Sequence, residues 1–397
     1  MTSTFASTTV FNRWSVMVAA LIAGTVTTLP SYALPFIVGS LADEFALTGR
    51  QAGWVGTAVM AGFGAGTLFT MYWQTRWKWR STCFFHSLIA VGFYSLMRVA
   101  DSIEVALLFQ FAGAAGLGGM YALVLTIFSR HKDPDRMIGI FMFIQIVFTS
   151  GYILSLSILI SRYGSFGIFG SLAAISLLII PCLFWFPKGD FTGTGARNSF
   201  ARPQFRFGLP LAFALIAMLC FGLNTAGVAS YLERMGNHAG LSLGQISSYI
   251  AIANLVSILG PALAIWWGDR FNRLLPLFVA VFCNFTGMVL LWNGGDSWLY
   301  PIGASLFFIS WMLGLPYLYA TIAALDDSRT IMPIAAVVLI VGSSLAPVFA
   351  GIFVTENTLN GVNIYAIVWI LACYAFVIPA LLRKTSLQHK VQSARPE

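Results

Sequence analysis

The chain has 397 residues, of which 58% are hydrophobic and only 9% are charged. About a quarter of the residues in a soluble globular domain are charged, so this composition excludes a soluble enzyme and a disordered chain. Five cysteines are too few for a small secreted fold held by disulfides. The formal charge of +8 would indicate a nucleic-acid partner only if the cations gathered on one face, whereas they are spread along the whole chain.

Twelve long apolar runs follow one another along the sequence. A helix needs roughly 20 mainly apolar residues to cross the hydrocarbon core, because every backbone amide must be hydrogen-bonded within the membrane. We therefore predict twelve transmembrane helices, of which the third and the ninth are short. They lie near residues 14–39, 52–73, 82–97, 105–128, 138–160, 164–186, 209–231, 245–267, 275–292, 298–323, 332–354 and 362–382.

The cations of the connecting segments are unevenly distributed. Only Arg50, Arg98, Arg162 and Arg234 fall in one alternate set of segments, whereas the rest of the 22 Lys and Arg residues fall in the set that contains both termini. Cytoplasmic segments carry an excess of Lys and Arg. We therefore expect a multi-pass protein of the plasma membrane, here a bacterial inner membrane, with both termini in the cytoplasm and no nucleic-acid partner.

A long polar connection divides the chain into two halves of six spans each. We expect an N-terminal six-helix bundle at residues 1–187, a cytoplasmic linker at 188–208 and a C-terminal six-helix bundle at 209–397. Sliding one half over the other gives matches at a nearly constant offset, which indicates an internal duplication. The matched pairs are Thr48 with Ser242, Gln51 with Gln245, Gly66 with Gly260, Trp73 with Trp267, Arg76 with Arg270 and Tyr121 with Tyr317.

Two of these pairs predict a local structure. Thr48 with Gln51 and Ser242 with Gln245 each have the spacing of a capping box, in which the first hydroxyl and the later carboxamide satisfy free amides at a helix start. We therefore expect the second and eighth spans to begin in the same way.

Two six-span repeats are typical of secondary transporters, in which a site near the membrane midplane lies between the halves. The loop after the eighth span, Ile265–Arg273, resembles the motif G-x-L-a-D-R-x-G-R-R of the major facilitator superfamily, since it keeps Asp269, Arg270 and Arg273. The matching loop after the second span, Met71–Arg80, keeps only the cations, with Thr75 in the place of the Asp.

This resemblance implies an all-α membrane protein whose twelve transmembrane helices form two pseudo-symmetric six-helix bundles. It also implies gating roles for Asp269, Arg270, Arg273 and Arg76, because an Asp near a span end can accept charge-assisted bonds from Arg and hold the cytoplasmic side closed. The alternative is that these arginines only anchor the topology.

By the same resemblance, the first, fourth, seventh and tenth spans line a central cavity, with the second, fifth, eighth and eleventh beside them. No charged residue lies near the middle of a span, so we expect a neutral or singly charged organic substrate held by aromatic faces, hydroxyls and carboxamides. The candidate substrate-binding residues are Tyr121, Tyr317, Asn224, Asn254, Gln145, Trp311, Thr28 and Thr149. The alternative for each is packing against lipid or a neighbouring helix.

Glu233, at the outer end of the seventh span beside Arg234, is the candidate for proton coupling. Burial would favour the protonated carboxyl, whereas the adjacent arginine would favour the carboxylate. The alternative is a surface ion pair.

We therefore predict a transporter that moves a small organic solute through the bilayer by alternating access, as a uniporter or proton symporter and as a monomer. The alternative is a proton-driven exporter of drugs or metabolites. Such exporters often carry G-x-x-x-G-P-x-x-G in the fifth span, and the matching stretch here, Ile146–Leu154, has no proline. An enzyme is not expected, because the spans hold no His, Asp and Glu cluster and no CxxC pair; we expect no metal and no cofactor.

Overall fold

The computed structural model describes residues 10–73, 77–187, 208–267, 270, 272–292, 297–325, 331–355 and 358–393, with the side chains of Asp135 and residues 382–393 left out. Within these ranges the regular structure is helical, with no strand, and an isolated β-bridge joins Thr355 and Thr358. Ten of the described helices are long and apolar enough to cross a membrane, and Phe166–Cys182 and Leu274–Leu290 are shorter apolar helices. Together they match the twelve predicted spans and confirm the all-α fold class.

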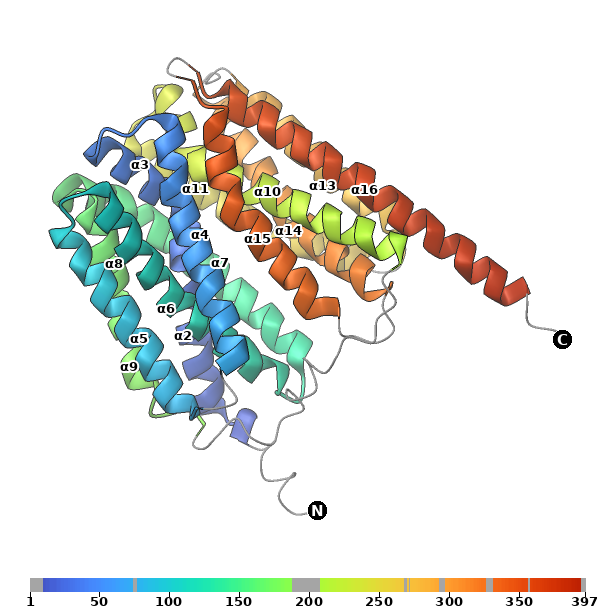
Figure 1. Cartoon of the computed structure of the whole chain (residues 1–397), viewed down its shortest axis with the longest axis horizontal. Coiled ribbons are helices and arrows are strands. Elements are labelled where there is room, and N and C mark those ends of the chain that lie inside the picture. The colour runs from blue at the N-terminus through green and yellow to red at the C-terminus, as the bar shows by residue number, and fades with distance from the viewer. Residues whose placement is uncertain are drawn as a thin grey trace. The chain divides into compact units, whose positions relative to one another are not determined.

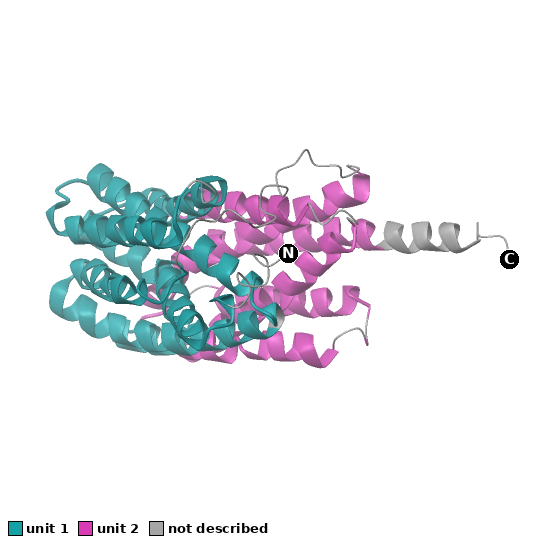
Figure 2. Ribbon diagram, turned by 90° about the horizontal axis from the view of Figure 1, so that it is seen from below, with its two compact units in different colours: residues 1–199, 242–251 teal, residues 200–241, 252–397 magenta. Residues whose placement is uncertain are grey.

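The chain forms two compact units, shown in separate colours in Figure 2. Unit 1 comprises residues 1–199 and 242–251, and unit 2 comprises residues 200–241 and 252–397. The expected linker at 188–208 lies outside the described residues except for Gly208. The predicted boundaries after residues 187 and 208 stay a prediction.

Unit 1 contains the first six spans (Figure 1). Two of these spans are interrupted: the first changes helix at Ala33, between Pro30 and Pro35, and the sixth changes helix at Leu178. Proline removes a backbone donor, which explains a break near Pro35. The helices are α2 (Trp14–Tyr32), α3 (Leu34–Glu44), α4 (Gly49–Trp73), α5 (Trp79–Leu96), the 3₁₀ turn η2 (Met97–Val99), α6 (Ile103–Ser129), α7 (Pro134–Tyr163), α8 (Phe166–Leu177) and α9 (Ile179–Cys182).

The remaining spans run from α10 to α16. The eighth span consists of two helices, α11 and α12, and the beginning of α11 belongs to unit 1. The helices are α10 (Leu209–His238), α11 (Leu243–Val256), α12 (Leu259–Trp267), α13 (Leu274–Leu290), α14 (Leu299–Ala323), α15 (Ile331–Ile352) and α16 (Asn360–Ser393).

The same neighbours recur inside the two units. In unit 1, α4 packs on α6, α2 packs on α6 and α7, and α5 packs on α6 and α8. In unit 2, α12 packs on α14, α10 packs on α14 and α15, and α13 packs on α14 and α16. These are the same pairs of spans in each half, which confirms the two pseudo-symmetric bundles.

Both predicted capping boxes are present with the same geometry. The Thr48 amide donates to Gln51 Oε1 at 2.9 Å, and the Gln51 amide donates back to Thr48 Oγ1 at 3.3 Å. The Ser242 amide donates to Gln245 Oε1 at 2.9 Å, and the Gln245 amide donates to Ser242 Oγ at 3.4 Å. The duplication therefore extends to the hydrogen bonds that begin α4 and α11.

The matched glycines Gly66 and Gly260 bring equivalent helices close together. A Cβ atom on Gly66 in α4 would lie 1.8 Å from the carbonyl oxygen of Ala115 in α6. A Cβ atom on Gly260 in α12 would lie 2.8 Å from the amide nitrogen of Leu313 in α14. Small residues allow this close approach in membranes, where van der Waals contact drives helix association.

Tyrosine hydroxyls join the helices of unit 2 through backbone carbonyls. Tyr365 in α16 donates to the Leu223 carbonyl of α10 at 3.0 Å, and Tyr300 in α14 donates to the Leu232 carbonyl at 2.8 Å. Gly227 makes room for the first of these rings, since a Cβ there would lie 2.6 Å from Tyr365 Cε1. These neutral bonds hold the bundle together without burying a charge.

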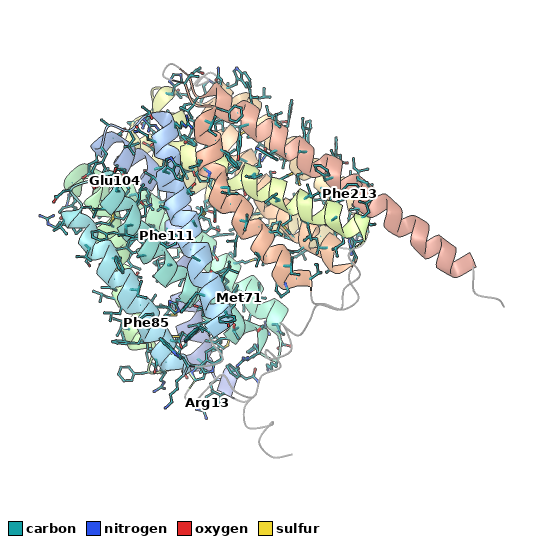
Figure 3. The ribbon with its side chains drawn as sticks, in the orientation of Figure 1. Arg13, Met71, Phe85, Glu104, Phe111 and Phe213 are labelled. Atoms are coloured by element: carbon teal, nitrogen blue, oxygen red, sulfur yellow. The ribbon has the colours of Figure 1, made fainter. Side chains whose placement is uncertain are left out.

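Large apolar side chains cover the outward surfaces of the spans. Phe85 on α5 and Phe111 on α6, labelled in Figure 3, keep 41% and 37% of their surface exposed. Such exposure would be costly in water, whereas it suits helices surrounded by lipid.

Candidate functional site

A hydrogen bond between side chains joins the first and fifth spans inside unit 1. Gln145 Nε2 in α7 donates to the Tyr32 hydroxyl in α2 at 2.9 Å, and both residues are buried, with exposed fractions of 9% and 8%. A carboxamide in an apolar bundle needs a partner on another helix, which explains this pairing. Gln145 was predicted as a site residue, whereas Tyr32 was not.

Tyr121 in α6 completes this cluster. Its ring packs on Phe141 of α7 with 6.3 Å between the centroids and on Phe63 of α4 with 5.4 Å. Phe141 lies one turn before Gln145 on the same face of α7, and Tyr121 is within electrostatic range of the Tyr32 hydroxyl. The structure therefore brings together two predicted residues, Tyr121 and Gln145, with Tyr32; we call these three residues the polar cluster.

A second carboxamide lies on the same face of α6. Gln110 and Tyr121 are three helical turns apart, so their side chains leave the helix in nearly the same direction. Gln110 is fully buried, and neither its oxygen nor its nitrogen has a hydrogen-bond partner among the described residues. A buried carboxamide with unused capacity costs about 1–3 kcal/mol, and a bound polar group would relieve this cost.

The predicted threonines bond to their own helices. Thr28 Oγ1 donates to the Thr25 carbonyl at 2.9 Å, and Thr149 Oγ1 donates to the Ile146 carbonyl at 3.2 Å. Both are buried, at 6% and 0% exposed. Their role in substrate binding stays a prediction.

Asn224 in α10 forms a reciprocal pair with Asn284 in α13. Each amide nitrogen donates to the oxygen of the other, at 3.3 and 3.0 Å, and Asn224 also donates to the Ala366 carbonyl of α16 at 2.7 Å. Both asparagines are fully buried. This arrangement joins three helices, so in the described conformation the Asn224 amide serves helix packing.

The other predicted residues of unit 2 are Tyr317, Trp311 and Asn254. Tyr317 is 8% exposed within the apolar core of unit 2, and Trp311 is half-buried and stacks on Phe308 with 6.2 Å between centroids. Asn254 near the end of α11 is fully buried. Whether these three residues contact a substrate stays a prediction.

Glu233 is buried at 4% exposed near the end of α10. Asn237, one turn later, donates from Nδ2 to Glu233 Oε1 at 2.5 Å, and Tyr300 lies within electrostatic range. Of the Asp, Glu, Lys and Arg residues that the structure describes, Glu233 is the only one that is buried. Glu233 is therefore buried and accepts a hydrogen bond from a neighbouring amide, and its role in proton coupling stays a prediction.

Two of the four predicted gating residues can be placed. Arg273 Nη1 donates to the Ala320 carbonyl in the last turn of α14 at 2.8 Å, and Arg270 is exposed. A cation at a helix C-terminus satisfies free carbonyls and is favoured by the helix dipole. Asp269 and Arg76 lie outside the described residues, and the gating role of all four stays a prediction.

Sequence reasoning missed Tyr32, Asn237, Asn284 and Tyr300, which contact the predicted residues. The sequence could have indicated Asn237, because it lies four residues after Glu233 and so on the same helix face. The local sequence gives no indication of Tyr32, Asn284 and Tyr300, because their partners come from distant helices.

No metal centre or redox pair is apparent in the part of the chain that the structure describes. No three His, Cys, Asp or Glu side chains of that part lie together so that they could hold a metal ion. All five cysteines are free thiols, and four of them are buried. They pack as small apolar residues.

Comparison with known structures shows the same fold. The D-xylose-proton symporter matches with a TM-score of 0.72 and 15% identity, covering 93% of this chain and 96% of the other. The nucleoside transporter NupG matches with a TM-score of 0.72 and 10% identity, over 92% and 99% of the two chains. The POT family transporter PepTSo matches with a TM-score of 0.70 and 11% identity, over 93% and 99%.

A search of curated protein sequences gives no match. The sequence profile of the Major Facilitator Superfamily matches residues 16–331, which is more than half of the chain. Together with the two repeated bundles, this match explains the composition, the span count and the loop after the eighth span. The chain is a multi-pass membrane transporter and belongs to the Major Facilitator Superfamily.

Proposed function

We propose that this transporter carries a neutral or singly charged small organic solute, by uniport or proton symport, and that the polar cluster forms part of the substrate site. The observation that carries the proposal is the meeting of Tyr32, Tyr121 and Gln145 from three different spans of unit 1. Polar side chains inside a membrane bundle are costly and therefore often functional.

The chemistry of the cluster supports a solute with hydroxyl or amide groups. Two phenols and one carboxamide offer both donors and acceptors, and the rings of Tyr121, Phe63 and Phe141 offer aromatic faces. The unused carboxamide of Gln110 adds one donor group and one acceptor on the same face of α6. The structures of similar fold include a D-xylose-proton symporter, a nucleoside transporter and a proton-dependent oligopeptide transporter, whose substrates also present hydroxyl or amide groups.

The distribution of charge supports a substrate of low charge. Tyr32, Tyr121 and Gln145 carry no formal charge, and no Asp, Glu, Lys or Arg other than Glu233 is buried among the described residues. A multiply charged solute would need buried counter-charges, because an unpaired charge in an apolar bundle is very costly.

A ligand screen tests the proposed site. Purified protein is heated with individual sugars, nucleosides and small peptides, since a ligand that binds the folded state raises the apparent melting temperature. We expect a compound that stabilises the wild type and loses at least about tenfold in affinity in Gln145→Leu, because a site built for a hydrogen bond rejects its loss. Ser157→Ala, at a partly exposed position of α7, is the matched control. Equal affinity in wild type and Gln145→Leu would remove the cluster from the site.

We also propose that Glu233 takes up the coupling proton if the transport is symport. Its carboxyl is buried and accepts a hydrogen bond from Asn237, and an ionisable group inside a membrane helix is costly and therefore often functional. The neighbouring titratable and charged groups of unit 2 are Tyr300 on α14, and Arg234 and Tyr231 on α10 itself.

Proteoliposomes separate coupling from binding. Glu233→Gln keeps the shape and can still accept from Asn237, but it cannot change charge. We expect this variant to lose accumulation driven by a pH gradient and to retain exchange of labelled for unlabelled solute. Accumulation equal to wild type would exclude Glu233 as the coupling group, and a wild type that ignores the gradient would indicate uniport.

The cation distribution leads us to propose a bacterial inner-membrane location with both termini in the cytoplasm, and we propose that the monomer is the working unit. Labelling of single cysteines introduced at the two ends, in intact cells and in inverted vesicles, tests the orientation. Protection of only one end in intact cells would contradict it.

A further inference from the structure

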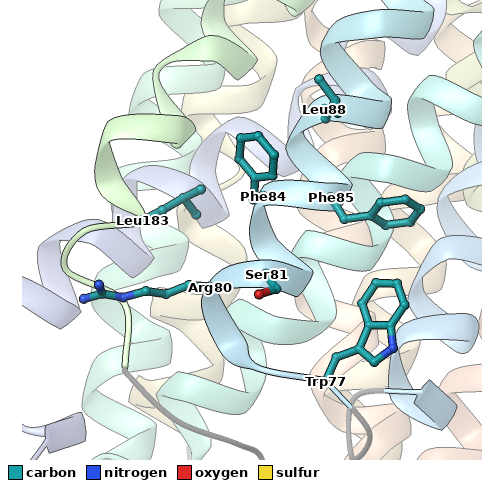
Figure 4. Close-up of a pocket in the computed structure, with 7 residues that line it drawn as sticks. All are labelled: Trp77, Arg80, Ser81, Phe84, Phe85, Leu88 and Leu183. Carbon is teal, nitrogen blue, oxygen red and sulfur yellow. The ribbon is translucent and has the colours of Figure 1, made fainter.

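A groove lies on the outer surface of unit 1 beside the beginning of α5 (Figure 4). Its volume is about 490 Å³, and part of its wall comes from Leu183, which follows α9. The residues that line it are Trp77, Arg80, Ser81, Phe84, Phe85, Leu88 and Leu183. The groove therefore combines one cation and one hydroxyl with five apolar side chains.

The cation of the groove is held in place by backbone carbonyls. Arg80 Nε donates to the Phe186 carbonyl at 3.0 Å, and its Nη2 donates to the Phe184 carbonyl. A guanidinium has five N–H donors, so three remain for another acceptor. No described carboxylate lies within ion-pair distance of Arg80, so the described structure provides no counter-charge for it.

The apolar part of the groove continues along α5 from this cation. Arg80, Phe84 and Leu88 are spaced by four residues, so they lie along one face over about 12 Å of helix. Phe84 and Leu88 keep 48% and 53% of their surface exposed, and Trp77 keeps 36%. Tryptophan is enriched where the membrane meets water, which agrees with its place just before α5.

We propose that this groove binds an anionic phospholipid of the leaflet next to the start of α5. The phosphate accepts hydrogen bonds from the free N–H groups of Arg80 and from Ser81, and an acyl chain lies along Phe84 and Leu88. Charge complementarity selects this occupant, because basic pockets beside transmembrane helices attract anionic headgroups. The exposed Lys78 adds a second positive charge at the same end of α5.

Lipid quenching of tryptophan fluorescence tests this site in the whole protein. Wild type and Trp77→Phe are reconstituted in phosphatidylcholine vesicles that contain either brominated phosphatidylglycerol or brominated phosphatidylcholine. The part of the quenching that disappears in Trp77→Phe reports the groove. We expect this part to saturate at a low fraction of brominated phosphatidylglycerol in the vesicle. With brominated phosphatidylcholine it should rise only in proportion to the fraction of brominated lipid.

Three variants assign the contributions of charge and shape. Arg80→Gln should weaken phosphatidylglycerol binding about fivefold, which is the effect of one cation at an anionic surface. Arg80→Lys should retain most of the binding, and Leu88→Phe, which adds no tryptophan to the fluorescence signal, should reduce it by filling the groove while leaving the Arg80 bonds intact. Lys132→Gln, an exposed cation of unit 1 that does not line the groove, is the matched control and should bind like wild type.

Three results would overturn the proposal. The first is equal quenching at Trp77 by the two lipids. The second is unchanged phosphatidylglycerol binding in both Arg80→Gln and Leu88→Phe. The third is full competition by soluble glycerol phosphate at the concentration of the lipid. The last result would indicate a site for a free anion. Because Leu88→Phe changes no charge and leaves the carbonyl contacts of Arg80, the test stands even if Arg80→Gln fails to fold.

Discussion

The two units place equivalent helices next to one another, but they use their buried polar side chains differently. In unit 2, Asn224 and three tyrosines donate hydrogen bonds to carbonyls or to another carboxamide, so these side chains hold helices together. In unit 1, Gln145 is bonded to a phenol, and Gln110 has no partner among the described residues. Asn224 and these tyrosines therefore serve helix packing in unit 2, whereas the groups that we propose for the solute lie in unit 1.

The closest helix contacts also differ between the units, and glycine variants should have the largest effect. Gly66→Ala should destabilise the protein by about 3 kcal/mol or more, because the new Cβ would overlap a backbone oxygen that cannot move without its helix. Gly260→Ala should lower stability less, since the new Cβ would lie 2.8 Å from its nearest neighbour, the Leu313 amide nitrogen. Thermal unfolding in detergent measures both, and a larger loss for Gly260→Ala would reverse the comparison.

An intermediate effect is expected from the carboxamides. Asn284→Leu leaves the Asn224 amide without its side-chain partner and should lower stability by about 1–2 kcal/mol. The double variant Asn224→Leu with Asn284→Leu should recover part of this loss, because no buried carboxamide then remains at that pair. Gln145→Leu in unit 1 should impair ligand affinity more than stability.

A double-mutant cycle on thermal unfolding checks the asparagine pair, and the ligand titration of the same variants checks Gln145. Strictly additive losses for the two asparagines would show that their hydrogen bonds contribute nothing to the packing of unit 2. If Gln145→Leu lost much stability but kept its ligand affinity, the buried carboxamides of both units would serve helix packing.

The smallest effect should be the same in both repeats. Gln51→Ala and Gln245→Ala each remove one capping box, and each should cost about 0.5–1 kcal/mol, because the two boxes have matching distances. Hydrogen exchange of the first turns of α4 and α11 measures this local loss. A difference above about 1 kcal/mol between the two sites would show that tertiary contacts dominate one of them.

Much of the fold was predictable because a membrane imposes simple rules on the sequence. The length of apolar runs located the spans, and the match of Thr48 and Gln51 with Ser242 and Gln245 located two helix starts and the duplication. The breaks at Ala33 and Leu178 were not predicted, because proline in a membrane helix can either kink it or end it, and neighbouring helices decide the outcome.

The candidate site was less predictable, because partners come from distant helices. Residue type and depth identified Gln145 and Tyr121, yet Tyr32 became part of the cluster only through a bond across 113 positions of sequence. Asn224 had the same features as Gln145, but its partner Asn284 belongs to a span without other candidate residues. Sequence alone could not distinguish a carboxamide that binds a solute from one that joins helices.

The contact between Gly227 and Tyr365 has an evolutionary consequence. The ring of Tyr365 occupies the space that any side chain at position 227 would need, and its hydroxyl reaches the Leu223 carbonyl only for that reason. The two positions should therefore covary among descendants of a common ancestor: lineages with a bulkier residue at 227 should have lost the phenol at 365, and should have acquired another donor near that carbonyl.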